Sequence, residues 1–562
     1  MPFSRRLISR RLSYALLLIV LSETFFMLLP MNLSIWRVSS GWLAGLLLFP
    51  VAAVAVLAGV EPGMSMASLW AMLSRYGGNT LTIMAESAAI SLLLALSFAL
   101  IMARYRFSGQ RWLHLALLLP LAMPAYLLAA VYGELLEFGG PVRQTFYALS
   151  FVRPSGWGFD WSQSLRQLSC SLCLALTLFP YLYLLVRATL MSLPESVMQS
   201  GQLHSPPGLQ MFFRVRFPLL RPTLWLGLAV VALEAVSDYG AASYFSVPTL
   251  TTASLDFWRD KAQFGAAARM ALALLPLIVL LGAIARHGRL WQVRYQRPAS
   301  PYPVERPEAP VWLRRVTLSA GWGLVLLAFG VPLLWLARHW LTTTVTLWTF
   351  PLLLATINSV LAATCATLIS LGLAMLYLFD RRTADNPAFR HPLRWLGFNR
   401  VLPGSLAGMG VLVALMLFDS RGMPLAMGVL SGSVLMLILV YSLRGASLII
   451  APMHQQLRQL PAGMNAMSRT LGYSTAQNIW LNVFPSVRGT LLVGALLVWS
   501  ESLRELNASL LLQRVNVDTL STYVFGFAEF DQLPWVAAPA FLLVLLGVPP
   551  VLGLHRLLQR EG

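Results

Sequence analysis

Charge is scarce in this chain. Of its 562 residues, 11% are Asp, Glu, Lys or Arg, whereas 57% are hydrophobic. A soluble domain carries about 25% charged residues, so this composition excludes an ordinary soluble enzyme or binding domain. Many apolar runs reach the ~20 residues that a helix needs to cross a bilayer. The apolar-polar alternation of a membrane β-barrel is absent. We therefore predict an all-α polytopic membrane protein in contact with the lipid bilayer.

Acidic residues are the rarer of the two signs. The chain has 41 Lys and Arg against 22 Asp and Glu, a formal net charge of +19. In a soluble protein such an excess would suggest a nucleic-acid partner. Here the basic residues lie in short loops between apolar runs, where they orient membrane helices. We therefore expect no nucleic-acid partner and a cytoplasmic position for the basic loops.

The chain has few cysteines and no common phosphate-binding loop motif. Of three cysteines, Cys170 and Cys173 share one apolar run, SCSLCLALTLF, without further Cys or His at zinc spacing. They are predicted to be packing residues, and we expect neither a metal site nor a cofactor. No G-x-x-x-x-G-K-[ST] motif occurs, so the chain is not expected to be an enzyme that hydrolyses ATP.

A basic, proline-rich segment near the middle divides the chain. Residues 286–315 (RHGRLWQVRYQRPASPYPVERPEAPVWLRR) have the composition of a solvated linker. The predicted organisation is an N-terminal extension (1–40), a first transmembrane domain (41–285), this cytoplasmic linker, and a second transmembrane domain (316–562). An extra apolar run at 12–31 lies in the extension, and its role is left open.

Each domain is predicted to have about six helices. The spans expected in the first domain are 41–60, 81–103, 113–132, 167–190, 224–245 and 266–285. Those expected in the second domain are 316–336, 352–378, 401–418, 424–443, 491–512 and 536–557.

One polar stretch occurs twice, 267 positions apart. Residues 193–222 (LPESVMQSGQLHSPPGLQMFFRVRFPLLRP) align without a gap with residues 460–489 (LPAGMNAMSRTLGYSTAQNIWLNVFPSVRG). The alignment continues into the next apolar run, where Glu234 faces Glu501. A period of this length indicates a duplicated domain rather than a solenoid.

Each copy predicts a helix break followed by two short helices. The Leu-Pro pair at its start ends a transmembrane helix, and the second short helix is expected to end at Phe-Pro. In the second copy the first short helix covers 462–471, and Gly472 is its C-terminal cap. Met464, Met467 and Leu471 share one face of it. Such a helix could lie on lipid, but two equivalent copies favour a docking element for a two-fold partner.

These stretches resemble the cytoplasmic coupling loop of binding-protein-dependent ABC importer permeases. The family pattern is Glu-Ala-Ala, three residues, Gly, about nine residues, then hydrophobic-x-Leu-Pro. The second copy keeps Gly472 and ends at Phe484-Pro485, but it begins with Ala466-Met467. The first copy keeps Phe217-Pro218, with Gln199-Ser200 at its start and Ser205-Pro206-Pro207 in place of the glycine.

The resemblance implies a type I ABC importer permease in a bacterial inner membrane. Its expected partners are two copies of a cytoplasmic ABC ATPase, one per loop, and a periplasmic substrate-binding protein. The first-loop residues expected at the ATPase are Gln199, Ser200, His204, Ser205, Pro206, Pro207, Phe213 and Pro218. The second-loop residues are Ala466, Met467, Arg469, Leu471, Gly472, Trp480 and Pro485.

Three further segments are similar to the fused iron(III) uptake permeases. They are residues 123–141, 237–253 and 503–522, with Asn507 standing where that group has proline. The resemblance implies iron(III) as cargo. Thiamine or a phosphonate-type molecule remains an alternative, and an ion-coupled secondary transporter or an intramembrane enzyme is the alternative from another class.

Four acidic residues occupy equivalent positions in or near apolar runs: Glu234, Asp238, Glu501 and Glu505. Acids within a membrane are costly, so they line a pathway or pair internally. Two interpretations are open, namely a lining for a cationic cargo and hydrogen bonding between packed helices. Glu86, in the run IMAESAAIS, is expected to be structural.

Overall fold

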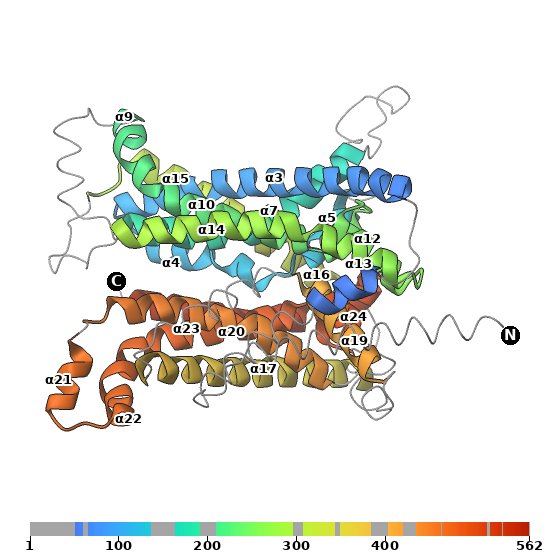
Figure 1. The fold of residues 1–562 in the computed structure, drawn as a ribbon. Coiled ribbons are helices and arrows are strands. Elements are labelled where there is room, and N and C mark those ends of the chain that lie inside the picture. The colour runs from blue at the N-terminus through green and yellow to red at the C-terminus, as the bar shows by residue number, and fades with distance from the viewer. Residues whose placement is uncertain are drawn as a thin grey trace.

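The computed structural model describes residues 51–59, 66–136, 163–191, 209–295, 307–342, 349–383, 403–419, 434–461, 463–513, 518–530 and 532–560. Within these residues the chain is helical, apart from loops and one isolated bridge between Arg106 and Glu308. The helices run side by side in two halves (Figure 1). The predicted extension, including the run at 12–31, lies outside the described residues.

The elements of the first half follow a short helical segment at 51–59. They are α3 (Met66–Arg104), α4 (Gln110–Ala116), η1 (Leu119–Ala122), α5 (Ala125–Leu136), α7 (Gln163–Met191), α9 (Leu209–Met211), η2 (Phe212–Arg216), α10 (Phe217–Ser237), α11 (Gly240–Tyr244), α12 (Leu250–Arg259), α13 (Phe264–Ala273) and α14 (Leu275–Tyr295).

The second half repeats this order. Its elements are α15 (Val311–Val325), η3 (Leu326–Gly330), α16 (Val331–Thr342), α17 (Phe350–Thr383), α19 (Gly404–Asp419), α20 (Val434–Gln459), α21 (Met464–Thr470), α22 (Thr475–Asn478), η6 (Ile479–Val483), α23 (Phe484–Arg504), α24 (Asn507–Leu512), α25 (Leu520–Glu529) and α26 (Leu533–Arg560).

The described residues contain nine helices that are long and apolar enough to cross a membrane, or ten with one bent pair. The bent pair covers the predicted span 113–132, which turns by 90° between Ala122 and Ala125. Pro120 and Pro124 lie at this turn, where each lacks the N–H that a continuous helix would need. The predicted span 424–443 is also displaced, because α20 continues to Gln459.

Hydrogen bonds between helices repeat in the two halves. Asn79 Nδ2 donates to the Pro248 carbonyl (2.9 Å), and Asn358 Nδ2 donates to that of Asp518 (3.1 Å). The helices that follow, α12 and α25, both begin with a Thr-x-x-Thr capping box. The duplication therefore extends to individual contacts.

The predicted end of the second short helix at Phe-Pro is wrong. In both halves a π-helical turn, η2 or η6, leads directly into α10 or α23, and the proline is in the first turn of that helix. Proline is common in the first turn of a helix because its missing N–H is not needed there. The π-helical turn just before it shifts the backbone hydrogen bonds from i−4 to i−5 spacing. The loop is therefore rigidly continuous with the span that follows it.

Both polar loops lie at the same end of the bundle. In Figure 1, α9 and the pair α21–α22 project at the left, whereas α12, α13 and α24 lie at the right. The strand bridge attaches the end of the linker to the basic loop after α3, because Arg106 N donates to the Pro307 carbonyl (3.0 Å). By the charge rule, this end is predicted to be cytoplasmic.

Helices of the second half pack against helices of the first half. The first span of the second half, α15 to α16, lies against α4 and α5 of the first half. Tyr132 donates a hydrogen bond to the Leu327 carbonyl (2.6 Å), and Trp335 Nε1 donates to Glu134. Further along, Phe525 of α25 packs between the rings of Tyr126 and Tyr239.

At Gly240 the backbone of the first half lies in close contact with a side chain of the second half. A Cβ atom there would lie 2.5 Å from Tyr126 Cβ and 2.8 Å from Leu506 Cδ2, one from each half. We expect Gly240→Ala to overpack the interface, cost about 1–3 kcal/mol and lower the detergent melting temperature. The control is Gly372→Ala in α17, where a Cβ meets nothing within 4 Å. Equal melting of the two variants would contradict the prediction.

Candidate functional site

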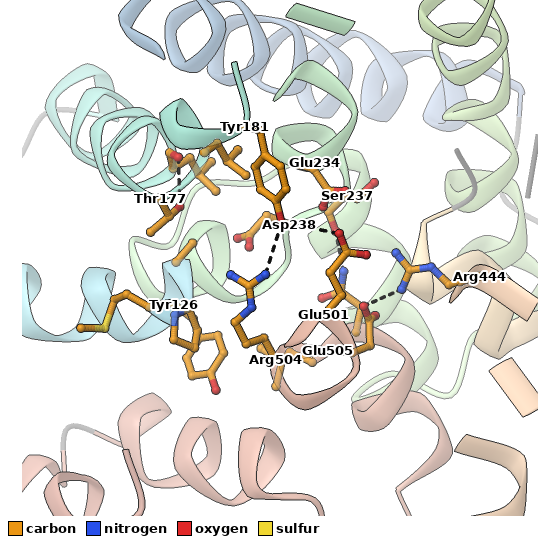
Figure 2. A pocket seen from close by; sticks show the side chains of 17 residues that line it. Tyr126, Thr177, Tyr181, Glu234, Ser237, Asp238, Arg444, Glu501, Arg504 and Glu505 are labelled. Atoms are coloured by element: carbon orange, nitrogen blue, oxygen red, sulfur yellow. Dashed lines mark hydrogen bonds and ion pairs between the residues drawn. The ribbon is translucent and has the colours of Figure 1, made fainter. Parts of the chain in front are cut away.

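A cavity of about 130 Å³ lies between the two halves (Figure 2). All four of the predicted acidic residues, Glu234, Asp238, Glu501 and Glu505, line it. Its other polar lining residues are Tyr126, Thr177, Tyr181, Ser237, Arg444, Arg504 and Asn507. The structure therefore brings together carboxylates that are about 270 positions apart in sequence.

Two of the acids lie at breaks in the helices. Helix α10 ends at Ser237 and α23 at Arg504, and the next residue of each, Asp238 or Glu505, is extended, with ψ of 126° and 116°. Each carboxylate then accepts a hydrogen bond from the following short helix, from Ala241 N (2.8 Å) or Ala508 N (3.3 Å). Such discontinuous helices bring backbone groups and side chains into a buried polar site.

Two arginines of the second half enter the same cavity. Arg444 Nη1 lies 2.5 Å from Glu505 Oε2, and both side chains are largely buried. Arg504 donates to the Tyr181 hydroxyl (3.3 Å) and to the Leu121 carbonyl, and Tyr181 in turn donates to Glu501 (3.5 Å). Removing one partner of a buried ion pair costs about 3–5 kcal/mol, so Arg444 and Glu505 stabilise each other within the second half. The hydrogen bonds of Arg504 to Tyr181 and Leu121 join the two halves.

The arginines were missed by sequence reasoning. Arg444 follows a run of apolar residues, and Arg504 stands three residues after Glu501, in the segment ESLRE. A search for intramembrane charges of both signs, rather than of acids alone, would have found them.

Gly404, at the start of α19, allows this ion pair to form. A Cβ atom at this position would lie 2.0 Å from Glu505 Oε1 and 2.9 Å from Arg444 Nη1. A side chain at position 404 would therefore displace the ion pair. The glycine is needed here because the pair lies against the backbone at this position.

The two interpretations of the acids are not exclusive in this geometry. Asp238 and Glu505 cap short helices, and Glu505 also pairs with Arg444, so both have a structural role. The same carboxylates line the cavity. Glu86, expected to be structural, accepts a hydrogen bond from Ser171 of α7 (2.7 Å).

The second polar loop has a well-defined turn. Helix α21 is followed by Gly472, whose φ of +81° is the left-handed conformation that favours glycine. Tyr473 N donates to the Ser468 carbonyl (3.0 Å), the bond of a Schellman motif. The predicted C-terminal cap at Gly472 is therefore confirmed.

The apolar side chains of this loop point in two directions. Met464 packs against the core of the second half, whereas Met467 and Leu471 are 68% and 67% exposed. Trp480, Ala466 and Pro485 are exposed too, and the side chain of Arg469 lies outside the described residues. Exposed large apolar groups at one end of the bundle are typical of an interaction surface.

Buried amide and hydroxyl groups join the short helices of this loop. Ser468 Oγ donates to Asn478 Oδ1 (2.7 Å), and Asn482 Nδ2 donates to the same oxygen (2.9 Å) and to Ser468 Oγ (3.1 Å). Ser468 and Asn478 are buried. This network, which sequence reasoning missed, fixes α21 against η6.

The first polar loop is described only in part. Six of its predicted contact residues lie outside the described residues: Gln199, Ser200, His204, Ser205, Pro206 and Pro207. Phe213 is 60% exposed and packs edge to face on Phe212, and Pro218 is exposed in the first turn of α10. Phe213 and Pro218 are equivalent to Trp480 and Pro485, which are exposed in the same places.

At the opposite end, an ion pair connects the halves. Arg259 Nη2 of α12 lies 3.4 Å from Glu529 Oε2 of α25, and the two residues end equivalent helices. Nearby, Asp256 accepts a hydrogen bond from Tyr239 (3.3 Å). Burial, and then the charge of Asp260, raise the pKa of Asp256 to about 6.

Paired polar loops on a duplicated helical bundle, with a charged cavity between its halves, define a membrane transport subunit. Residues 95–288 match the family model described as binding-protein-dependent transport system inner membrane component. The chain thus contains an inner-membrane permease domain of the ABC importer class, and its helices have the type I permease fold. Permeases of this family work with an ATPase and a periplasmic binding protein.

Three transport permeases are similar to this chain. The Fe(3+)-transport system permease protein FbpB 2 of Haemophilus influenzae is 23% identical over 484 residues, covering 84% of this chain and 88% of that protein. The molybdenum transport system permease protein ModB of the same species is 27% identical over 170 residues (30% and 69%). The sulfate transport system permease protein CysT of Salmonella typhimurium is 26% identical over 191 residues (33% and 65%). The resemblance to fused iron permeases is confirmed.

The buried network in the second loop predicts a mutational effect. We expect Asn478→Ala to leave the Ser468 hydroxyl and the Asn482 amide without their shared acceptor, at a cost of about 1–3 kcal/mol. Amide hydrogen exchange over residues 463–483 should increase, and ATP-driven uptake should fall. Thr470→Ala is the control, because that hydroxyl is exposed and bonds only within its own helix. Unchanged exchange in Asn478→Ala would contradict the prediction.

Proposed function

We propose that the chain forms the translocation path for iron(III) delivered by a periplasmic binding protein. The observation that carries this proposal is the cavity in which four carboxylates meet two guanidinium groups. With all six groups ionised, the excess is negative, which favours a cation over an oxyanion such as molybdate or sulfate. The relative from an Fe(3+)-transport system aligns over most of this chain, and those from molybdenum and sulfate systems over about a third.

The carboxylates also suit the cargo chemically. Hard cations prefer oxygen ligands, and Asp and Glu supply them. A transit site must release its cargo, so a lining in which carboxylates already have partners is more suitable than a closed ligand cage. In this proposal, the transmembrane domains are residues 41–285 and 316–562, joined by the linker at 286–315.

We further propose that two ATPase subunits drive transport, one under each polar loop. The chain lacks a phosphate-binding motif of its own, and the second loop presents exposed Met467, Leu471 and Trp480. Each loop continues without a break into α10 or α23, whose far ends carry the cavity acids. Closure of the ATPase pair would therefore move the cavity walls and alternate its access.

Iron uptake tests the proposed cargo. In a strain lacking the chromosomal copy, we expect Glu234→Gln to reduce uptake of radiolabelled ferric iron roughly tenfold or more, equivalent to about 1.4 kcal/mol. Glu86→Gln is the matched control, because this carboxylate lies outside the cavity and Gln keeps an acceptor for Ser171. Parallel assays with thiamine, a phosphonate, molybdate and sulfate distinguish the alternatives. Normal ferric uptake without the permease would refute the proposal.

Equivalent loop residues test the coupling. Phe213 and Trp480 are 267 positions apart and both exposed, so Phe213→Asp and Trp480→Asp make the same chemical change in the two loops. We expect both to weaken co-purification of the ATPase. Trp480→Asp should reduce uptake more, because the second loop retains the glycine turn at Gly472. Gly472→Arg should also impair uptake. Equal losses from the paired variants would contradict the predicted inequality of the loops.

A further inference from the structure

The cavity is asymmetric in the sign of its charges. The offset of 267 that relates Glu234 to Glu501 also relates Thr177 to Arg444 and Ser237 to Arg504. An equivalent hydrogen bond in each half supports this alignment of α7 with α20. Ser91 Oγ donates to the carbonyl of Ala175 (3.4 Å), and Ser370 Oγ donates to that of Ser442 (3.1 Å). The two acceptors, Ala175 and Ser442, are 267 positions apart. Each half thus contributes two acids, and the second half contributes both arginines.

The hydroxyls that replace the arginines remain on their own helices. Thr177 donates to the carbonyls of Cys173 (3.3 Å) and Leu174 (3.0 Å), and Ser237 donates to that of Leu233 (2.7 Å). Neither brings a charge toward Asp238, whose carboxylate accepts from the backbone of α11. The first-half side of the cavity therefore lacks a guanidinium from its own half.

The two arginines differ in how firmly they are anchored. Arg504 donates to the carbonyls of Ser500 and Leu121 and to the Tyr181 hydroxyl, so contacts from both halves fix it. The side chain of Arg444 instead forms an ion pair with the carboxylate of Glu505. A cation that enters the cavity can therefore compete with Arg444 for Glu505 without breaking a backbone contact of that arginine.

We propose that Arg444 is a tethered counter-ion that occupies Glu505 between transport events and sets how tightly the cavity holds a cation. This inference rests on the proposed function. Because Arg444 occupies Glu505, it limits how many carboxylates a trivalent cation can gather in the cavity. Because Arg444 and the cargo are both positively charged, they repel each other, which favours release of the cargo.

Adding the missing arginine tests the asymmetry. Thr177→Arg places a guanidinium at the symmetric position on the first-half side, and Thr177→Met adds a long uncharged side chain there. We expect ferric uptake by Thr177→Arg to be roughly tenfold or more below that of Thr177→Met. Equal uptake by the two variants would overturn the proposal, because it would show that charge at this position is irrelevant.

Removing the counter-ion tests the same idea from the other side. The full chain in nanodiscs is titrated with Tb³⁺, a hard trivalent cation. Arg444→Gln should bind Tb³⁺ roughly tenfold more tightly than Arg444→Lys, which keeps the charge, and the uptake assay should show a lower kcat with a lower KM. If Arg444→Gln does not fold, Arg444→Gln/Glu505→Gln removes both charges, and the Thr177 pair decides the question.

The outcomes separate the two proposals. If the wild-type chain neither supports ferric uptake nor binds Tb³⁺, the proposed function fails and this inference fails with it. If the wild type does both, while Arg444→Gln equals Arg444→Lys or Thr177→Arg equals Thr177→Met, the counter-ion role is wrong and the proposed function stands.

Discussion

The structure depends on how charges and open backbone groups are satisfied inside an apolar bundle. At Asp238 and Glu505 the two central helices break, which frees backbone donors away from water. The acidic side chains cap the short helices that follow, and Arg444 compensates Glu505. An unpaired charge or orphaned donor there would cost several kcal/mol, so each break is stable only with its partners present.

This constraint connects the two ends of the molecule. Each broken helix begins in one of the two polar loops, passes through a π-turn without interruption, and ends at the cavity. In the proposed mechanism, a displacement of a loop is transmitted along one helix to the acids at its far end. Buried hydrogen bonds among Ser468, Asn478 and Asn482 hold the short helices of the second loop together.

Duplication explains the architecture, and the two halves depart from it at a few positions. Capping boxes, π-turns and interhelical hydrogen bonds recur in both halves, because the same packing problem was solved by the same residues. Two exceptions concern charge, because Thr177 and Ser237 are equivalent to Arg444 and Arg504. A third concerns backbone conformation, because Ser205 stands where the second half has Gly472. A symmetric scaffold thus encloses an asymmetric cavity.

The sequence alone determined the class, the repeat and the glycine turn, because hydropathy, a fixed offset and a helix cap are local properties. It also singled out Glu234, Asp238, Glu501 and Glu505 from their positions in apolar runs. Only the tertiary structure decided that these acids share one cavity with Arg444 and Arg504. Those contacts join residues tens to hundreds of positions apart, and they form only when α7, α10, α20 and α23 pack together. The continuity through Phe-Pro was likewise fixed by packing, which there overrides what proline predicts locally. The bend after Ala122 instead follows the local signal of Pro120 and Pro124.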